Sequence, residues 1–377
     1  MPAHLTLAFL SVVSALSCAL LTYLSARLPA LLSAPAPWAS SMALRGALSA
    51  LVAIYFVTGT WLNPRAPLGR LLAWLSALWM GLLVALTLCA ALHHAGVALI
   101  GLCGGAPPAW AGGAALALAV CAWLAGVARA VSEPALREVE VRVPGLPEGL
   151  RGLKVLQLSD LHVGPTLGRA FTERLAARAR ALSPDLIAIT GDLVDGRVEL
   201  LRRDVEPLLG LSAPCGVFFV TGNHELISGA GAWVRCVREG GVRVLENEWA
   251  LCERGGVPFV VAGVEDWEGG RFPPGGRAPS LARALEGAPA VGLTILLAHQ
   301  PKAAAKASAR GVSLQLSGHT HGGQLWPFTW LVYLDQPYRA GLYWVGRMAL
   351  YVSEGTGYWG PPLRWGTRGE VSLLRIS

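Results

Sequence analysis

The chain has 377 residues, of which 53% are hydrophobic and only 15% are charged, against roughly 25% charged residues in soluble globular domains. The residues before Glu133 include five arginines and no carboxylate, whereas the rest of the chain is nearly balanced, with 26 basic and 24 acidic residues. The apolar content excludes a disordered chain, and the near-neutral second half argues against binding of long nucleic acid, which needs clustered Lys and Arg.

Four long apolar runs without an internal charge lie in the first part of the chain. They are Leu5–Ala26, Gly46–Leu62, Leu71–Leu92 and Ala109–Val127. Each is close to the roughly 20 residues that a helix needs to cross the hydrocarbon core of a bilayer. We therefore predict that residues 1–130 form a membrane domain with about four transmembrane helices, in preference to a buried helical domain of a soluble protein.

The arginines at the ends of these runs predict an orientation. With four spans, one side holds Arg65, Arg70, Arg129 and Arg137 and the other holds only Arg27 and Arg45, so the positive-inside rule assigns the first side to the cytoplasm. The expected location is the inner (cytoplasmic) membrane of a bacterium, with the second domain in the cytoplasm. The runs contain no acidic residue that could relay protons or cations, so anchorage is favoured over transport. His93 and His94 are expected to mark a loop.

The composition changes at residues 131–151, where prolines interrupt the chain, and we interpret this segment as a linker. From 152 to 377, short β-rich runs alternate with segments of helical periodicity, which predicts an α/β domain with parallel strands at its centre. Strands are expected at Lys154–Leu158, Leu186–Thr190, Val217–Val220, Phe259–Val264, Thr294–Leu297 and Leu314–Leu316. Helices are expected at Leu167–Leu182, Glu199–Leu209, Ala230–Arg238, Pro279–Leu285 and Lys302–Ala309. The last strand-like pieces, from Tyr343 to Ile376, are typical of antiparallel edge strands.

Asp, Asn or His follows five of the expected strands. In chain order these residues are Asp160 and His162, Asp192, Asn223 and His224, His299, and His319 and His321. The carboxyl ends of strands form the edge at which open α/β sheets bind ligands. All five histidines of the second half lie at these positions, which is hard to reconcile with scattered structural histidines.

These side chains offer oxygen and imidazole donors and no thiolate, a mixture that suits Mn, Fe or Zn. The set is larger than the four ligands of a structural zinc ion, so two divalent metal ions bridged by a carboxylate are the simplest interpretation. A pair of ions of this kind binds a phosphoryl group and lowers the pKa of a water molecule for in-line displacement.

The motifs Asp-x-His, Gly-Asp, Gly-Asn-His-Glu, His and Gly-His-Thr-His, in this order, resemble those of the calcineurin-like metallophosphoesterase superfamily. The resemblance extends from about Lys154 to the end of the sequence. The stretch Ser317–Gln324 and the later Glu-Gly-Thr-Gly-Tyr segment are similar to the membrane-associated bacterial branch that includes the YkuE and YaeI proteins. That branch also includes an enzyme that cleaves the pyrophosphate of UDP-diacylglucosamine.

The resemblance implies a four-layer αββα sandwich and a role for each motif position. The implied metal ligands are Asp160, His162 and His321 for one ion, Asn223, His299 and His319 for the other, and Asp192 between both. The resemblance also implies that His224 acts on the scissile phosphate, as general acid or as stabiliser of the transferring group. The form Gly191-Asp-Leu-Val-Asp195-Gly-Arg departs from the Gly-Asp-x-x-Asp-Arg-Gly of protein phosphatases, so serine/threonine phosphatase activity is not expected.

Several further residues near these motifs have two interpretations each. Asp195 and Glu225 either orient imidazoles or are solvated loop carboxylates. Gln300 and Gln324 either face the metals or a substrate oxygen, or hold loops through their amides. Arg364 either contacts a phosphate or is an ordinary surface arginine, with the second preferred.

The aromatic stretch Leu325–Tyr333 follows the last motif. Such a stretch either dips into the bilayer interface, where Trp and Tyr are favoured, or packs in the core, and core packing is preferred. If it is exposed, a lipid-linked phosphodiester or pyrophosphate becomes the natural substrate.

We therefore expect a membrane-anchored, dimetal phosphohydrolase that acts on phosphodiester or pyrophosphate bonds, with the lipid bilayer as its partner and a substrate such as UDP-diacylglucosamine. One alternative is a nucleotide phosphodiesterase of the same superfamily. Another is a non-enzymatic, metal-dependent membrane receptor or scaffold, which the loss of a ligand or of His224 would have favoured.

Overall fold

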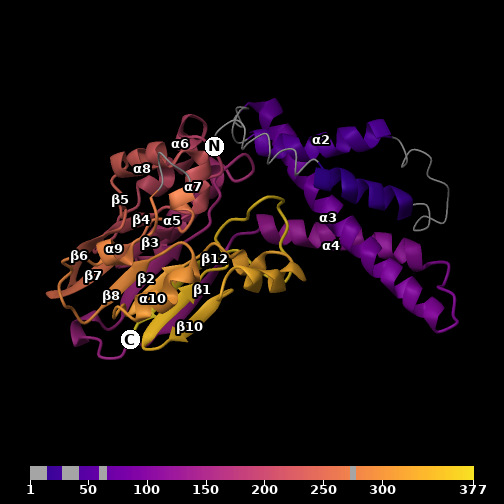
Figure 1. Ribbon diagram of the computed structural model, residues 1–377. Helices are drawn as coiled ribbons and strands as arrows, with labels where there is room; N and C mark the ends of the chain where they lie inside the picture. Colours follow the sequence, from indigo (N-terminus) through magenta and orange to yellow (C-terminus); the bar gives the residue numbers. More distant parts are fainter. Residues whose placement is uncertain (1–14, 28–41, 59–65, 272–276) are drawn as a thin grey trace. The chain divides into compact units, whose positions relative to one another are not determined.

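The computed structural model describes residues 15–27, 42–58, 66–271 and 277–377, and the chain divides into two compact units (Figure 1). One unit contains the apolar helices that precede Glu133, and the other contains all strands of the described residues. This division agrees with the change of composition near residue 131.

The apolar unit consists of helices. They are a helix over residues 15–27, α2 (Met42–Thr58), α3 (Pro67–Leu102) and α4 (Ala111–Val131). Among the described residues, α3 and α4 are long and apolar enough to cross a membrane; α3 contains the third apolar run, and α4 contains the fourth except for its first two residues. Parts of the first two runs lie outside the described residues, so the count of four spans remains a prediction.

Helix α3 is longer than its apolar run. Its 36 residues correspond to about 54 Å, against about 30 Å for a bilayer core. His93 and His94 lie inside this helix, so the expectation that they mark a loop was wrong. No proline interrupts the interior of α3, and the helix ends only before Gly104, whose φ of +77° favours glycine.

The second unit has two six-stranded sheets. In spatial order the first sheet contains β1 (Ala135–Val141), β12 (Glu370–Ile376), β2 (Leu153–Leu158), β3 (Leu186–Thr190), β4 (Val217–Val220) and β5 (Arg243–Val244). The second contains β10 (Gly341–Val345), β11 (Met348–Val352), β9 (Leu314–Ser317), β8 (Thr294–Leu297), β7 (Val257–Gly263) and β6 (Glu248–Arg254). Strands β2 to β5 are parallel to one another, as are β7, β8, β9 and β11.

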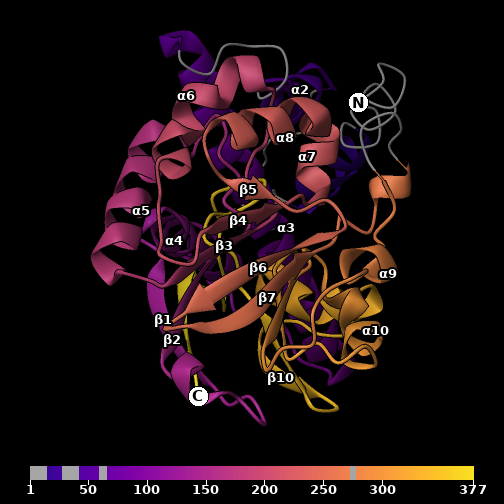
Figure 2. The ribbon, with the colours of Figure 1, turned by 90° about the vertical axis from the view of Figure 1, so that its left-hand side faces the viewer.

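The two sheets pack face to face and are covered by helices outside. The central core includes Val155 and Phe218 from the first sheet and Ile295 and Leu316 from the second. The helices of the first sheet's outer face are α5 (Arg169–Leu182), α6 (Val198–Leu209) and α8 (Ala230–Glu239). Those of the second sheet's outer face are α9 (Leu281–Ala284) and α10 (Ala304–Ser308). Figure 2 shows these two groups of helices on opposite sides of the strands. The expected αββα sandwich is therefore confirmed.

All six expected strands are present, because each is a short apolar run buried on both faces. The expected linker, 131–151, instead contains β1, which pairs in parallel with β12. Strand β12 was expected at an edge, but it lies between β1 and β2. The burial of β12 explains this central position, since six of its seven residues are buried.

Candidate metal centre

The polar residues that follow the strands converge at one place. Asp160 and His162 follow β2, Asp192 follows β3, Asn223 and His224 begin helix α7 (Asn223–Ser228) after β4, His299 follows β8, and His319 and His321 follow β9. Because the sheets face each other, their carboxyl-terminal edges supply the two sides of one site. The structure thus brings together every motif residue that the sequence singled out.

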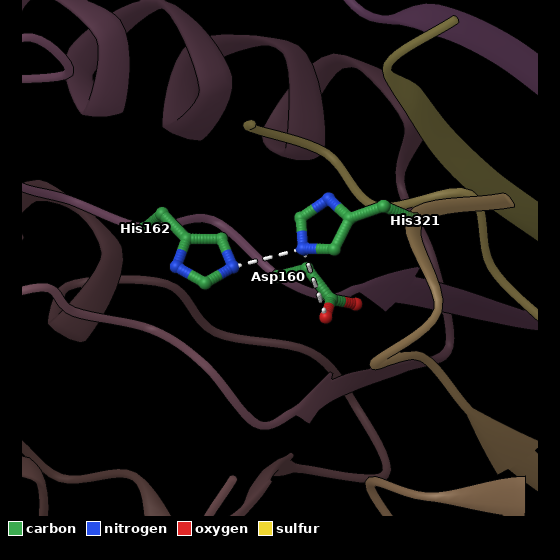
Figure 3. A group of neighbouring side chains, drawn as sticks. All are labelled: Asp160, His162 and His321. Carbon is green, nitrogen blue, oxygen red and sulfur yellow. Dashed lines mark hydrogen bonds and ion pairs between the residues drawn. The ribbon is translucent and has the colours of Figure 1, made fainter. Parts of the chain in front are cut away.

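The first group contains Asp160, His162 and His321 (Figure 3). The Nε2 atoms of the two histidines lie 2.9 Å apart, and His321 Nε2 lies 3.6 Å from Asp160 Oδ1. Asp160 Oδ2 is buried and has no hydrogen-bond partner in the protein. Two facing imidazole nitrogens beside an unpartnered carboxylate oxygen form a donor set that a divalent cation would satisfy.

The second group contains Asp192, Asn223, His299 and His319. Asn223 Oδ1 lies 3.2 Å from His299 Nε2 and 3.0 Å from His319 Nδ1. Asp192 Oδ2 lies 3.2 Å from His299 Nε2 and, on the other side, 3.8 Å from His162 Nε2. The Asp192 carboxylate therefore connects the two groups, and both fit a cation by the chemistry of their oxygen and nitrogen donors.

Five of these residues have left-handed backbone conformations, which are uncommon outside glycine. The φ angles are 52° at Asp160, 48° at His162, 50° at Asp192, 70° at His319 and 50° at His321. Strain of this kind, of the order of 1–3 kcal/mol per residue, concentrates at functional sites. Backbone hydrogen bonds connect the segments that follow the strands. The Asp160 amide donates to the Gly191 carbonyl, and the His162 amide donates to the Asp192 carbonyl, each at 3.0 Å.

Glycines allow the strand ends to approach each other closely. A Cβ on Gly222 would collide with the Asp192 carboxylate, and one on Gly318 would collide with Ser159 and Asp160. The backbone at these positions thus lies against the candidate ligands.

Asp195 joins a candidate ligand to the candidate acid. Its Oδ1 lies 2.8 Å from His162 Nδ1 and 2.6 Å from His224 Nδ1. Burial disfavours the charged forms, but the two imidazoles hold the pKa of Asp195 below its usual range. Burial likewise opposes charge on His224, yet Asp192 and Asp195 raise the pKa of this imidazole to about 9 when only the protein's own groups act. Of the two interpretations of Asp195, orientation of imidazoles is the correct one.

Glu225 is neither a solvated loop carboxylate nor a residue that orients an imidazole, so both interpretations from the sequence were wrong. Its carboxylate is buried and accepts from the backbone amides of Asp192, Leu193, Val194 and Gly222, at 2.7–3.2 Å. It therefore holds the loops that carry Asp192 and Asn223 and does not orient an imidazole.

Gln300 and Gln324 hold loops. Gln300 donates to Asp266 Oδ2 at 3.2 Å and accepts from Gln336 at 3.0 Å. The Gln324 amide donates to the Trp359 carbonyl at 2.9 Å and accepts from the Trp359 amide at 3.0 Å. Sequence reasoning missed Asp266, although it follows β7 and the same strand-end rule would have found it.

The expectation that Arg364 is a surface arginine was wrong. Its side chain is buried and donates to the carbonyls of Glu354 at 2.9 Å and Gly357 at 2.6 Å, beside His321 Nδ1 at 3.5 Å. These carbonyls accept from Nη2 and Thr367 accepts from Nη1, so Arg364 fixes the loop behind His321.

The preference for core packing of the aromatic stretch was also wrong. In the 3-10 helix η6 (Phe328–Leu334) only Thr329 is buried. Trp359, which sequence reasoning did not single out, lies beside the site, with its ring centroid 5.9 Å from that of His224.

Comparison with known proteins gives a family match. The family model of calcineurin-like phosphoesterases matches residues 153–323. A transmembrane protein with metallophosphoesterase domain from Danio rerio is 39% identical over 268 residues, 69% of this chain and 61% of that protein. An uncharacterized metallophosphoesterase of Campylobacter jejuni is 34% identical over 69% of this chain and 68% of its own length. YkuE of Bacillus subtilis is 31% identical over 61% of this chain and 81% of its own length. The match covers only 56–61% of the length of three animal relatives.

Proposed function

The chain belongs to the calcineurin-like phosphoesterase family, and we propose that it is a membrane-anchored phosphohydrolase that cleaves phosphodiester or pyrophosphate bonds with two divalent ions, Mn, Fe or Zn. As a member of this family it is a metal-dependent phosphoesterase. The number and identity of the ions, the bond cleaved and the substrate belong to the proposal.

The position of Asp192 carries the proposal. One oxygen of this buried carboxylate lies within 3.8 Å of imidazoles from both donor groups. In the proposed assignment, one ion would be held by Asp160, His162 and His321, the other would be held by Asn223, His299 and His319, and Asp192 would serve both. Ions bound in these groups would polarise the phosphoryl oxygens and lower the pKa of a water molecule.

His224 is the proposed general acid. Asp195 accepts from its Nδ1, which leaves Nε2 as the nitrogen that donates to the leaving oxygen. Asp192 Oδ1 also accepts from the His224 backbone amide at 2.9 Å, so the acid and the bridging carboxylate are positioned together. Asp195 acts as a positioning residue for both His224 and His162.

The membrane anchor supports a lipid-linked substrate, of the class of UDP-diacylglucosamine, because the tethered domain works where such molecules are concentrated. The relatives named as transmembrane proteins and the two apolar helices indicate membrane association. We propose the inner membrane of a bacterium as the location, with the catalytic domain in the cytoplasm, from the arginines at the helix ends.

Hydrolysis of bis(p-nitrophenyl) phosphate by the full chain in detergent, with and without Mn²⁺, tests the proposal. Asp192→Asn removes the bridging charge and is expected to abolish turnover and lower bound metal. His224→Ala is expected to lower turnover with metal retained, by about a hundred- to ten-thousand-fold for diesters whose leaving oxygen needs the proton and by less for this good leaving group. Glu199→Gln, which neutralises an exposed carboxylate on α6, is the matched control. Wild-type turnover by Asp192→Asn, or no turnover by metal-loaded wild type with any diester or pyrophosphate, would overturn the proposal.

A further inference from the structure

The segment after the last metal motif presents large apolar side chains to the outside. They are Trp326, Phe328, Trp330, Leu331, Tyr333 and Leu334, which we name the aromatic surface. Trp330 is 66% exposed and Leu334 is 84% exposed. Exposed apolar side chains are ordinary when they are scattered, but six within nine residues form a patch that signals an interaction.

The segment that carries the aromatic surface is fixed to the rest of the domain by contacts of its backbone and of its two ends. Thr329, the one buried residue of η6, packs against Gly323, where a Cβ would collide with the Thr329 backbone. The Trp326 amide donates to the Trp365 carbonyl at 2.9 Å. At the far end, Asp335 forms an ion pair with Lys302 at 2.7 Å. The apolar side chains are therefore exposed on a fixed support rather than on a loose loop.

This surface adjoins the candidate metal centre. Gln324, which lies between His321 and Trp326, is bonded through both ends of its amide to the Trp359 backbone. Trp359 is 44% exposed, and its ring lies beside the ring of His224, the proposed acid. Trp359 thus connects the aromatic surface to the place where a leaving group would be.

Two observations favour a lipid bilayer as the partner of the aromatic surface. First, residues 325–334 contain no charged side chain, and their Trp, Tyr, Phe and Leu are the residues that favour the head-group region. Second, the same chain carries its own membrane anchor: only residues 132–134 separate α4 from β1, a reach of at most about 14 Å. A soluble partner would have to compete with a bilayer that is always within reach of this domain.

We propose that the aromatic surface inserts into the head-group region of the bilayer that anchors the chain, so that the metal centre opens next to the phosphates of membrane lipids. Insertion rests on membrane association and not on the proposed chemistry. A failure of insertion therefore differs from a failure of hydrolysis, and each is measured separately.

Photocrosslinking of the full chain in phosphatidylcholine–phosphatidylglycerol vesicles tests the proposal. The photoreactive residue p-benzoylphenylalanine replaces Leu331 or Leu334, and in the matched control it replaces Leu251, a 53% exposed leucine on β6. Lipid adducts, measured by mass spectrometry, are expected to be at least about tenfold more abundant at 331 and 334 than at 251. Equal adducts at all three positions would overturn the proposal, as would adducts from 331 and 334 to protein in place of lipid.

Tryptophan fluorescence provides an independent measurement without a photoreactive group. In vesicles that contain brominated lipid, Trp330→Phe is expected to remove part of the quenched emission. Trp249→Phe, which removes a partly buried tryptophan on β6, the strand that also carries the control position Leu251, is expected to leave the quenched part unchanged. Equal quenching of the wild type and Trp330→Phe would contradict insertion.

Discussion

Replacing Asp195 tests whether one carboxylate positions both a metal ligand and the acid. Its Oδ1 accepts from His162 at 2.8 Å and from His224 at 2.6 Å. A hydrogen bond to a charged group contributes about 1.5–3 kcal/mol and a neutral one about 0.5–1.5 kcal/mol. Asp195→Asn keeps an acceptor but loses the charge, which weakens each hydrogen bond by about 1–1.5 kcal/mol. Asp195→Ala removes both hydrogen bonds.

The expected kinetic effect follows from the bond to His224. Since about 1.4 kcal/mol corresponds to tenfold in rate, Asp195→Asn is expected to lower kcat about tenfold and Asp195→Ala up to about a hundredfold. The loss of the bond to His162 is expected to weaken metal binding about ten- to a hundredfold, as removal of a ligand's orienting partner does.

The assay measures kcat at saturating Mn²⁺ with two diesters, one with a good and one with a poor leaving group. If Asp195 acts through the acid, its loss slows the poor leaving group more, because that oxygen needs the proton. Glu199→Gln again serves as the control variant. The reasoning is refuted if Asp195→Ala slows both substrates equally while metal remains bound, or if it leaves kcat unchanged.

Three further predictions concern the support of the site. Gly222→Ala is expected to lower metal content, measured by mass spectrometry of the purified protein, because its Cβ collides with the Asp192 carboxylate; retained metal would contradict this. Arg364→Leu is expected to destabilise the domain by about 3 kcal/mol, seen as a lower Tm, because it leaves the Glu354 and Gly357 carbonyls without their donor; an unchanged Tm would argue against this role. Removal of metal with a chelator is expected to abolish turnover and lower the Tm, because the buried carboxylates Asp160 and Asp192 lose their counter-charge; a Tm that chelation does not move would contradict this.

The centre could be predicted from sequence because its residues follow a local rule. Each parallel strand, such as β3, is a short run buried on both faces, so its end is easy to locate, and the residue after it must lie at the ligand-binding edge. Parallel pairing within each sheet, together with the face-to-face packing of the two sheets, then brings together residues such as Asp160 and His319, which are far apart in the chain.

Other features depend on tertiary contacts that no local pattern contains. The role of Arg364 is set by carbonyls of its own loop, and burial of an arginine is rare enough that a surface position was the natural expectation. An aromatic run such as Leu325–Tyr333 has the same composition whether it is buried or exposed. Its exposure could therefore be determined only from the three-dimensional structure. The two-residue strand β5 is too short to show any periodicity.

Electron paramagnetic resonance of the Mn²⁺-loaded full chain, together with its metal content, tests the central claim most directly. We expect two ions per chain with a spin-coupled signal, and loss of the coupled signal in Asp192→Asn, because Asp192 lies between the two donor groups. A single ion per chain, or two uncoupled ions that Asp192→Asn does not affect, would contradict a bridged two-metal centre.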